Sequence, residues 1–283
     1  MNKTLLRSFI DNALREDVGD GDHSSLACIP AEAEGKVQLL VKEAGVLAGV
    51  EAAFEVFKHV DPDTIINPLL YDGTHVQPED VAFSVRGRTQ TLLKAERLVL
   101  NIMQRMSGIA TCTHEYVKLT EGLNTRILDT RKTTPGMRFL EKAAVKIGGG
   151  ENHRMGLFDM IMLKDNHVDF SGGIGNAITT TQEYLRKTGK KLQIEIEVRN
   201  MEELREVLAK GGVHRIMLDN FDVTTLREAV DLIDGRYETE ASGGITKETL
   251  RAYAECGVDF ISIGALTHHI RSLDMSLKAL KPD

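Results

Sequence analysis

The apolar residues of this chain follow two different spacings, one before and one after a long helical stretch. Before residue 90, short runs of β-like spacing predict strands, and one run with three-and-four spacing predicts a helix. From Thr91 to about Leu119 the three-and-four spacing continues, which predicts a single long amphipathic helix. The expected strands cover residues 36–41, 65–70 and 82–88, and the expected short helix covers residues 50–60.

After the long helix, short apolar runs are separated by helical segments, which is the arrangement of parallel β/α units. A closed barrel of such units has eight strands, whereas six are legible in this chain, so we predict an incomplete barrel. The six expected strands cover residues 127–128, 160–163, 194–198, 215–218, 237–240 and 260–263.

These patterns predict an α/β protein in which a small open α+β sandwich domain precedes an incomplete parallel β/α barrel. We place the domain boundary at Gly108, which gives domains at residues 1–108 and 109–268. The C-terminal stretch, about residues 269–283, is expected to be a helix that joins the first domain.

Composition narrows the classes of function. A net charge of -7 argues against a nucleic-acid-binding surface, which needs clustered Lys and Arg. The three cysteines, Cys28, Cys112 and Cys256, are scattered and form no Cys-x-x-Cys, so they favour neither a disulfide framework nor a zinc site. No stretch approaches the roughly 20 apolar residues that span a bilayer. We therefore expect a cytoplasmic protein without nucleic-acid or membrane partners.

Polar clusters follow each of the six expected strands. The C-terminal ends of parallel barrel strands converge on one face, and catalytic groups come from several strands there. Any one such cluster is more often a solvated loop than a site, so the repetition at all six strands carries the interpretation. The clusters begin at Asp129, Lys164, Glu197, Asp219, Glu240 and Gly264.

Basic residues dominate one part of this expected rim. Arg side chains bind carboxylates and phosphates with two hydrogen bonds, and Lys adds a mobile charge, so the set matches a ligand with two or more anionic groups. The members are Arg131, Lys132, His153, Arg154 and Lys164.

Acidic residues and glycines form the rest of the rim. Glu197 and Asp219 follow successive strands, and two carboxylates beside a phosphate site suggest Mg²⁺ held directly or through water. Ser242, Gly243 and Gly264 follow the last two strands, where barrels commonly bind a phosphate with backbone N–H groups. These residues predict a phosphorylated ligand and a metal that the substrate helps to hold.

Motifs spread over nearly the whole chain resemble the quinolinate phosphoribosyltransferase family. The resemblance runs in order through Glu16–Asp22, Glu96–Arg97, Ser107–Thr111, Asp129–Thr133, Gly148–Arg154, Leu163–His167, Leu218–Asn220, Ala241–Ile245 and Gly264–His268. The sequence departs from the family pattern at Ser24, Ser25 and Thr239, none of which belongs to the expected site.

The resemblance implies a reaction of quinolinate with phosphoribosyl pyrophosphate that gives nicotinate mononucleotide, pyrophosphate and CO₂. It implies that the five basic residues above bind quinolinate, together with Arg97 from the neighbouring subunit of a homodimer. Phosphoribosyl pyrophosphate and Mg²⁺ are expected near Lys132, Lys164, Asp165, Glu197 and Asp219, and the 5-phosphate near Ser242, Gly243, Gly264 and His268. The expected catalytic residues are Lys132, Lys164, Glu197 and Asp219.

Three alternatives stay open on the sequence alone. A phosphoribosyltransferase of the same fold could act on nicotinate or another acceptor, although five basic groups favour a dicarboxylate. A Schiff-base lyase could use Lys164 at a strand end as its nucleophile. A sensor without catalytic activity could bind a phosphorylated ligand at the same rim.

Overall fold

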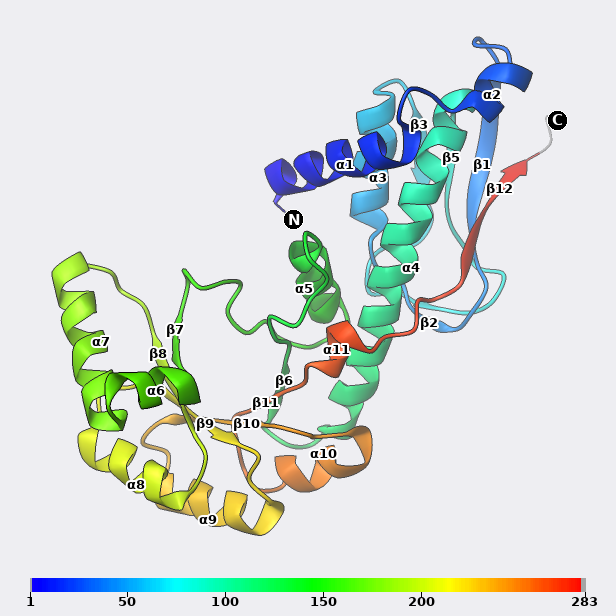
Figure 1. Cartoon of the computed structure of the whole chain (residues 1–283). Helices are drawn as coiled ribbons and strands as arrows, with labels where there is room; N and C mark the ends of the chain where they lie inside the picture. The colour runs from blue at the N-terminus through cyan, green and yellow to red at the C-terminus, as the bar shows by residue number, and fades with distance from the viewer. Residues whose placement is uncertain (1, 281–283) are drawn as a thin grey trace. The chain divides into compact units, whose positions relative to one another are not determined.

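The computed structural model of the protein describes residues 2–280. The chain forms two compact units, and both are assembled from separate segments (Figure 1). The first unit comprises Met1–His114, Thr133–Gly149 and Ala265–Asp283, and the second comprises Glu115–Lys132 and Gly150–Gly264.

The first unit is built around an antiparallel sheet of four strands in the order β12-β1-β5-β3. Buried Val37, Leu39 and Val41 alternate along β1, so one face of the sheet meets the core. The strands are β1 (Glu34–Val41), β3 (Ile65–Pro68), β5 (Val81–Arg88) and β12 (Met275–Leu280), and a separate pair is formed by β2 (Gly45–Val46) and β4 (His75–Val76).

Helices cover this sheet. The predicted short helix is confirmed as α3 (Val50–Val60), whose Phe57 packs edge-to-face on Phe83 of β5 with ring centroids 6.2 Å apart. The other helices of the first unit are α1 (Lys3–Val18), α2 (His23–Cys28), α5 (Arg138–Ile147), α11 (Ala265–His268) and most of α4 (Thr89–Leu119). Among the described residues, no helix combines the length and apolar character needed to cross a bilayer.

The long helix α4 runs without interruption through Gly108. The glycine is explained by close packing, because a Cβ at this position would lie 2.3 Å from the backbone oxygen of Arg271. Gly108 therefore lets the C-terminal segment of the first unit pass against the helix.

The expectation of a C-terminal helix is wrong for the described residues. Residues 275–280 form strand β12, which pairs antiparallel with β1. Met275 and Leu277 are buried while Lys278 is exposed, so a period of two along this short stretch places apolar side chains on the core face of the sheet. The remainder of the predicted helix, residues 281–283, lies outside the described residues.

The second unit confirms the six predicted parallel strands, in the order β6-β11-β10-β9-β8-β7. Within the described residues β6 and β7 are the two edges, so the barrel is incomplete. The strands are β6 (Arg126–Leu128), β7 (Ile161–Leu163), β8 (Ile194–Val198), β9 (Arg215–Asp219), β10 (Glu238–Ser242) and β11 (Phe260–Ser262).

Helices follow β7, β8, β9 and β10 and lie along the outside of the parallel strands (Figure 1). Asn200 and Asp222 cap α8 and α9 with side-chain oxygens that accept backbone N–H groups, so each polar strand end also starts the next helix. The helices are α6 (Asp165–Ser171), α7 (Ile174–Thr188), α8 (Met201–Lys210), α9 (Val223–Ile233) and α10 (Lys247–Ala254).

Candidate active site

The end of β6 holds the loop that carries His153 and Arg154. Glu151 forms an isolated parallel bridge with Leu128, so the chain returns beside β6 at this point. Two residues later, the backbone N–H of His153 donates to Oδ1 of Asp129 at 2.8 Å, and Asp129 is fully buried. A buried carboxylate at the strand end thus fixes the backbone position of the predicted ligand-binding histidine.

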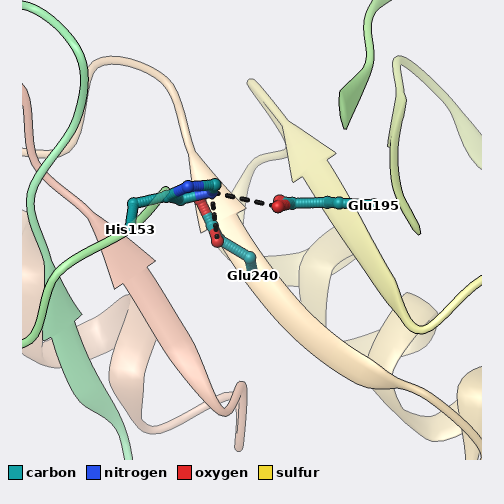
Figure 2. Close-up of side chains that lie close together, drawn as sticks. All are labelled: His153, Glu195 and Glu240. Atoms are coloured by element: carbon teal, nitrogen blue, oxygen red, sulfur yellow. Dashed lines mark ion pairs between the residues drawn. The ribbon is translucent and has the colours of Figure 1, made fainter. Parts of the chain in front are cut away.

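The His153 side chain points into the barrel between two glutamates (Figure 2). Its Nε2 lies 3.0 Å from an oxygen of Glu195 on β8 and 3.4 Å from an oxygen of Glu240 on β10. Neither carboxylate is exposed to solvent. Burial alone would lower the pKa of His153, but the two carboxylates raise it from 6.5 to about 9.

Arg215 on β9 adds a second positive charge to this cluster. Its guanidinium donates to Glu240 at 3.1 Å and to Glu238 at 3.0 Å, and it lies 4.0 Å from the centre of the Phe260 ring. Although burial opposes ionisation of Glu240, hydrogen bonds from His153 and Ser262 and the attraction of Arg215 lower its pKa. The interior of the barrel therefore contains a buried network of two acids and two bases.

The predicted catalytic residues Lys164, Glu197 and Asp219 come together at the ends of three neighbouring strands. The Nζ atom of Lys164 lies 2.9 Å from Oε2 of Glu197. Burial raises the pKa of Asp219, the charge of Glu197 raises it further, and the charge of Lys164 opposes both. These carboxylates are close enough to interact, and their oxygens suit a hard cation such as Mg²⁺.

Asn220 links this acidic pair to the predicted phosphate turn. Its amide nitrogen donates to Asp219 at 2.6 Å, and its backbone N–H donates to the Ser242 carbonyl at 2.8 Å. Gly243 has a φ of 98°, and a Cβ there would lie 2.2 Å from the Asn220 side-chain oxygen. Only glycine fits this turn. The hydrogen bond from Asn220 to Ser242 and the close contact of Asn220 with Gly243 hold the ends of β9 and β10 together.

The remaining basic residues of the second unit differ in exposure. Lys132 is exposed, and Arg131 and Arg154 are partly buried. Arg154 donates to the Met160 carbonyl at 3.3 Å. Its pKa is lowered by burial and by the neighbouring charge of Arg131. Two guanidiniums that repel each other at a partly buried position form a suitable binding site for an anion.

The other predicted residues are distributed over both units. Asp165, the first residue of α6, and Gly264, which follows β11, belong to the second unit. Arg97 and His268 belong to the first unit, where Arg97 is exposed on α4 and His268 is exposed at the end of α11. The roles of Arg97 and His268 stay predictions that rest on the family resemblance.

The sequence analysis missed the interior acid Glu195, and it named Glu240 only as the start of a polar cluster, without assigning it a role. A signal for Glu195 is present in the sequence. In Ile194-Glu-Ile-Glu-Val198 a charged residue occupies every second position of a strand whose residues are all buried. Because side chains alternate between the faces of a strand, this pattern places Glu195 and Glu197 on the same interior face.

Comparisons with known proteins extend over nearly the whole chain. Residues 22–107 match the family model described as "Quinolinate phosphoribosyl transferase, N-terminal domain", and residues 109–278 match the corresponding C-terminal domain. A chloroplastic carboxylating nicotinate-nucleotide pyrophosphorylase from Arabidopsis thaliana is 46% identical, covering 96% of this chain and 82% of the relative.

Bacterial proteins show the same similarity. A probable carboxylating nicotinate-nucleotide pyrophosphorylase from Bacillus subtilis is 40% identical, covering 98% of this chain and 94% of the relative. The crystal structure of NadC from Streptococcus pyogenes superposes with a TM-score of 0.92 at 37% identity, covering 99% of both chains.

Proposed function

Because the chain belongs to the quinolinate phosphoribosyltransferase family, we propose that it converts quinolinate and phosphoribosyl pyrophosphate to nicotinate mononucleotide, pyrophosphate and CO₂. This is a step of NAD biosynthesis. The observation that carries the proposal is the match of both family domains, combined with a cationic and acidic rim at the ends of the parallel strands.

Quinolinate would bind to the basic residues of the rim. Its two carboxylates match two or more cationic side chains, and the partly buried guanidiniums of Arg131 and Arg154 support this assignment. The proposed quinolinate ligands are Arg97, Arg131, Lys132, His153, Arg154 and Lys164.

The phosphoribosyl pyrophosphate would lie across the acidic part of the rim and the phosphate turn. Its 5-phosphate would accept backbone N–H groups and side-chain donors at Ser242, Gly243, Gly264 and His268. The locked geometry of Gly243 supports this role, because only a turn without a Cβ lets a phosphate approach the backbone closely. Asp165 would contact the ribose pyrophosphate from the first turn of α6.

Mg²⁺ is the proposed cofactor, held by Glu197 and Asp219 either directly or through water. The neighbouring carboxylates fit the ion, since Mg²⁺ prefers oxygen ligands and commonly shares them with substrate phosphates. When bound there, Mg²⁺ would supply positive charge that neutralises pyrophosphate.

The chemistry requires little covalent participation from the protein. The pyridine nitrogen attacks C1 of the ribose while the C1–O bond to pyrophosphate breaks. The 2-carboxylate then leaves as CO₂, its electron pair stays on C2 beside the positively charged ring nitrogen, and a proton from water adds to C2 to complete nicotinate mononucleotide. Glu197 and Asp219 would favour the positive charge that develops at C1. Lys132 and Lys164 would stabilise the departing pyrophosphate by fixed electrostatic interactions, the term that usually contributes most of the rate.

We also propose a homodimer with a shared active site, in which Arg97 reaches quinolinate in the partner subunit. The family resemblance supports this arrangement, together with the exposed position of Arg97 on α4. A cytoplasmic location remains our proposal, supported by the three scattered cysteines, whose spacing suggests no disulfide framework. The Arabidopsis relative is described as chloroplastic.

The direct test is incubation of the purified protein with quinolinate, phosphoribosyl pyrophosphate and Mg²⁺, followed by measurement of pyrophosphate and CO₂. We expect equal amounts of both products, and little product when nicotinate replaces quinolinate. Equal turnover of nicotinate would favour the alternative acceptor. Covalent trapping of Lys164 by borohydride with a carbonyl substrate would favour the lyase.

A further inference from the structure

We propose that Glu195 and Glu240 are positioning residues, which hold the His153 ring by its Nε2 atom from inside the barrel and thereby make its other edge a binding group for the anionic substrate. The inference rests on the proposed function, because it assigns a purpose to two buried acids through the quinolinate ligand His153. Neither glutamate would touch the substrate itself.

The geometry gives the two acids one common partner. Glu195 lies on β8 and Glu240 on β10, with β9 between them, and both carboxylates reach the same nitrogen of His153 (Figure 2). The backbone of His153 is fixed separately by Asp129. Contacts from β8, from β10 and from the residue that follows β6 thus determine both where His153 lies and how its ring is oriented.

The opposite edge of the ring, which carries Nδ1, contacts the backbone of the next residue. Nδ1 accepts the backbone N–H of Arg154 at 2.6 Å, which assigns the ring proton of this state to Nε2, between the glutamates. A carboxylate of the substrate would replace this contact only if Nδ1 carried a proton of its own. The two acids favour that second proton, because they place negative charge beside the ring.

Burying this cluster lowers the stability of the folded protein, which argues that the cluster has a role in function. Glu195 is fully buried, and its Oε1 atom has no hydrogen-bond partner among the described residues. A buried acid without full hydrogen bonding destabilises a protein, and replacing such an ion pair with apolar residues is often neutral or stabilising. A requirement to hold His153 explains why an acid occupies this position.

The distances favour a proton between these groups over a metal ion. His153, Glu195 and Glu240 offer ligand atoms within 4.8 Å of one another, a grouping that could surround a cation. However, Nε2 already lies 3.0 Å and 3.4 Å from the two carboxylates, which are the distances of ion pairs. Arg215, bound to Glu240, supplies further positive charge in the same network.

The test compares Glu195→Gln and Glu240→Gln with the control Glu238→Gln. Glu238 lies two positions before Glu240 on β10 and also binds Arg215, whereas His153 forms its ion pairs with Glu195 and Glu240. Gln keeps the size of each side chain and removes its charge. Dissociation constants for quinolinate are measured by calorimetry, alongside KM for phosphoribosyl pyrophosphate and thermal melting.

We expect Glu195→Gln and Glu240→Gln to weaken quinolinate binding about tenfold or more, which is the contribution of a hydrogen bond to a charged group. KM for phosphoribosyl pyrophosphate should stay near the wild-type value, and Glu238→Gln should change neither. In a His153→Gln background, the Glu240→Gln substitution should have no additional effect, because the residue through which it acts is gone.

Two outcomes would overturn the inference in an active wild-type enzyme. One is quinolinate affinity in folded Glu195→Gln and Glu240→Gln proteins equal to that of the Glu238→Gln control. The other is full additivity with His153→Gln. An inactive wild-type protein would instead refute the proposed function.

A second measurement applies if the glutamine variants fail to fold. Long-range ¹H–¹⁵N spectra of the wild-type protein report the protonation of each imidazole nitrogen, and the signal lost in His153→Gln assigns the ring. We expect Nε2 to be protonated at neutral pH both without and with quinolinate, and Nδ1 to be protonated when quinolinate is bound. An unprotonated Nε2, or a stoichiometric metal bound to it, would contradict the inference.

Discussion

Lys164 at the end of β7 and Glu197 at the end of β8 form an ion pair, with Nζ 2.9 Å from Oε2. Glu197→Gln should lower kcat/KM by roughly a hundredfold or more, because a preorganised charge in an active site contributes about 2.7 to 4 kcal/mol to the transition state. Steady-state kinetics at saturating Mg²⁺ measure the effect. The control Glu115→Gln breaks another Lys–Glu pair, with Lys247, that lies outside the proposed site. Equal activity of the two variants would contradict the role of Glu197.

Gly243 should tolerate no side chain. Gly243→Ala introduces a Cβ where the Asn220 oxygen would be 2.2 Å away, so the phosphate turn must shift. We expect a large rise in KM for phosphoribosyl pyrophosphate, with the Kd for quinolinate less affected. The control is Gly244→Ala, whose φ of 62° is also left-handed but which has open space around its Cβ position. A similar KM in both variants would show that the clash is irrelevant to substrate binding.

Quinolinate binding should weaken as the pH rises through about 9. The carboxylates raise the pKa of His153 from 6.5 to about 9, so the charged ring is present below that pH and is lost above it. For folding, the stabilisation by this pairing is fully present below pH 6.5 and disappears as the pH passes about 9. The carboxylates that face the ring are Glu195 and Glu240, while Asp129 accepts the backbone N–H of His153. Arg154 is adjacent to the ring, and Arg215 binds Glu240.

The measurement is the Kd for quinolinate between pH 7 and 10, compared with the same series for His153→Gln. The variant should bind weakly with a flatter profile. Identical profiles would show that another group is responsible for the pH dependence.

Complementation between variants tests the shared site. Arg97→Ala and Lys164→Ala should each be inactive alone, and random pairing would make about half of the dimers mixed. Each mixed dimer would contain one site with both residues intact and one with neither. Activity should therefore recover to about a quarter of wild type per protomer, if the two sites are independent. No recovery from dimers shown to be mixed would leave Arg97 as an ordinary helix residue.

Arg105 should contribute strongly to the stability of the first unit. It donates to buried Glu141 at 2.7 Å, and also to Thr134 and to the Thr267 carbonyl. Arg105→Met leaves Glu141 as a buried charge without this partner and should cost about 3 to 5 kcal/mol. The control is Arg86→Met, whose pair with Glu34 is exposed and should contribute at most about 1 kcal/mol. Chemical denaturation measures the free energy of unfolding of both variants, and equal decreases in the two would contradict the prediction.

The strands could be predicted from the sequence because their apolar runs are short, separate and followed by polar residues. Each of the six runs in the second unit is a strand of the parallel sheet. The same reasoning indicated Lys164, Glu197 and Asp219 as neighbours, since the ends of adjacent parallel strands must lie together. Local pattern and topology were sufficient for this part of the site.

Other features depend on contacts that no local pattern reports. Residues 275–280 form a strand because β1 offers an unpaired edge more than two hundred residues away in sequence. The role that we propose for Glu195 and Glu240 likewise depends on the ion pairs that both form with Nε2 of His153, a residue far from them in sequence. Side chains buried inside a barrel are determined by partners from other strands, and those pairings are long-range.

Strand β12 also determines when the four-stranded sheet can finish folding during protein synthesis. Its partner β1 leaves the ribosome early, but the hydrogen-bonding edge that β12 covers stays open until residues 275–280 have been translated. The four-stranded sheet therefore reaches its final form only after the whole barrel sequence has been produced. A nascent chain must carry an incomplete sheet with an exposed edge, which is a template for association with other strands. A chain that terminated before β12 would keep the edge of β1 exposed permanently.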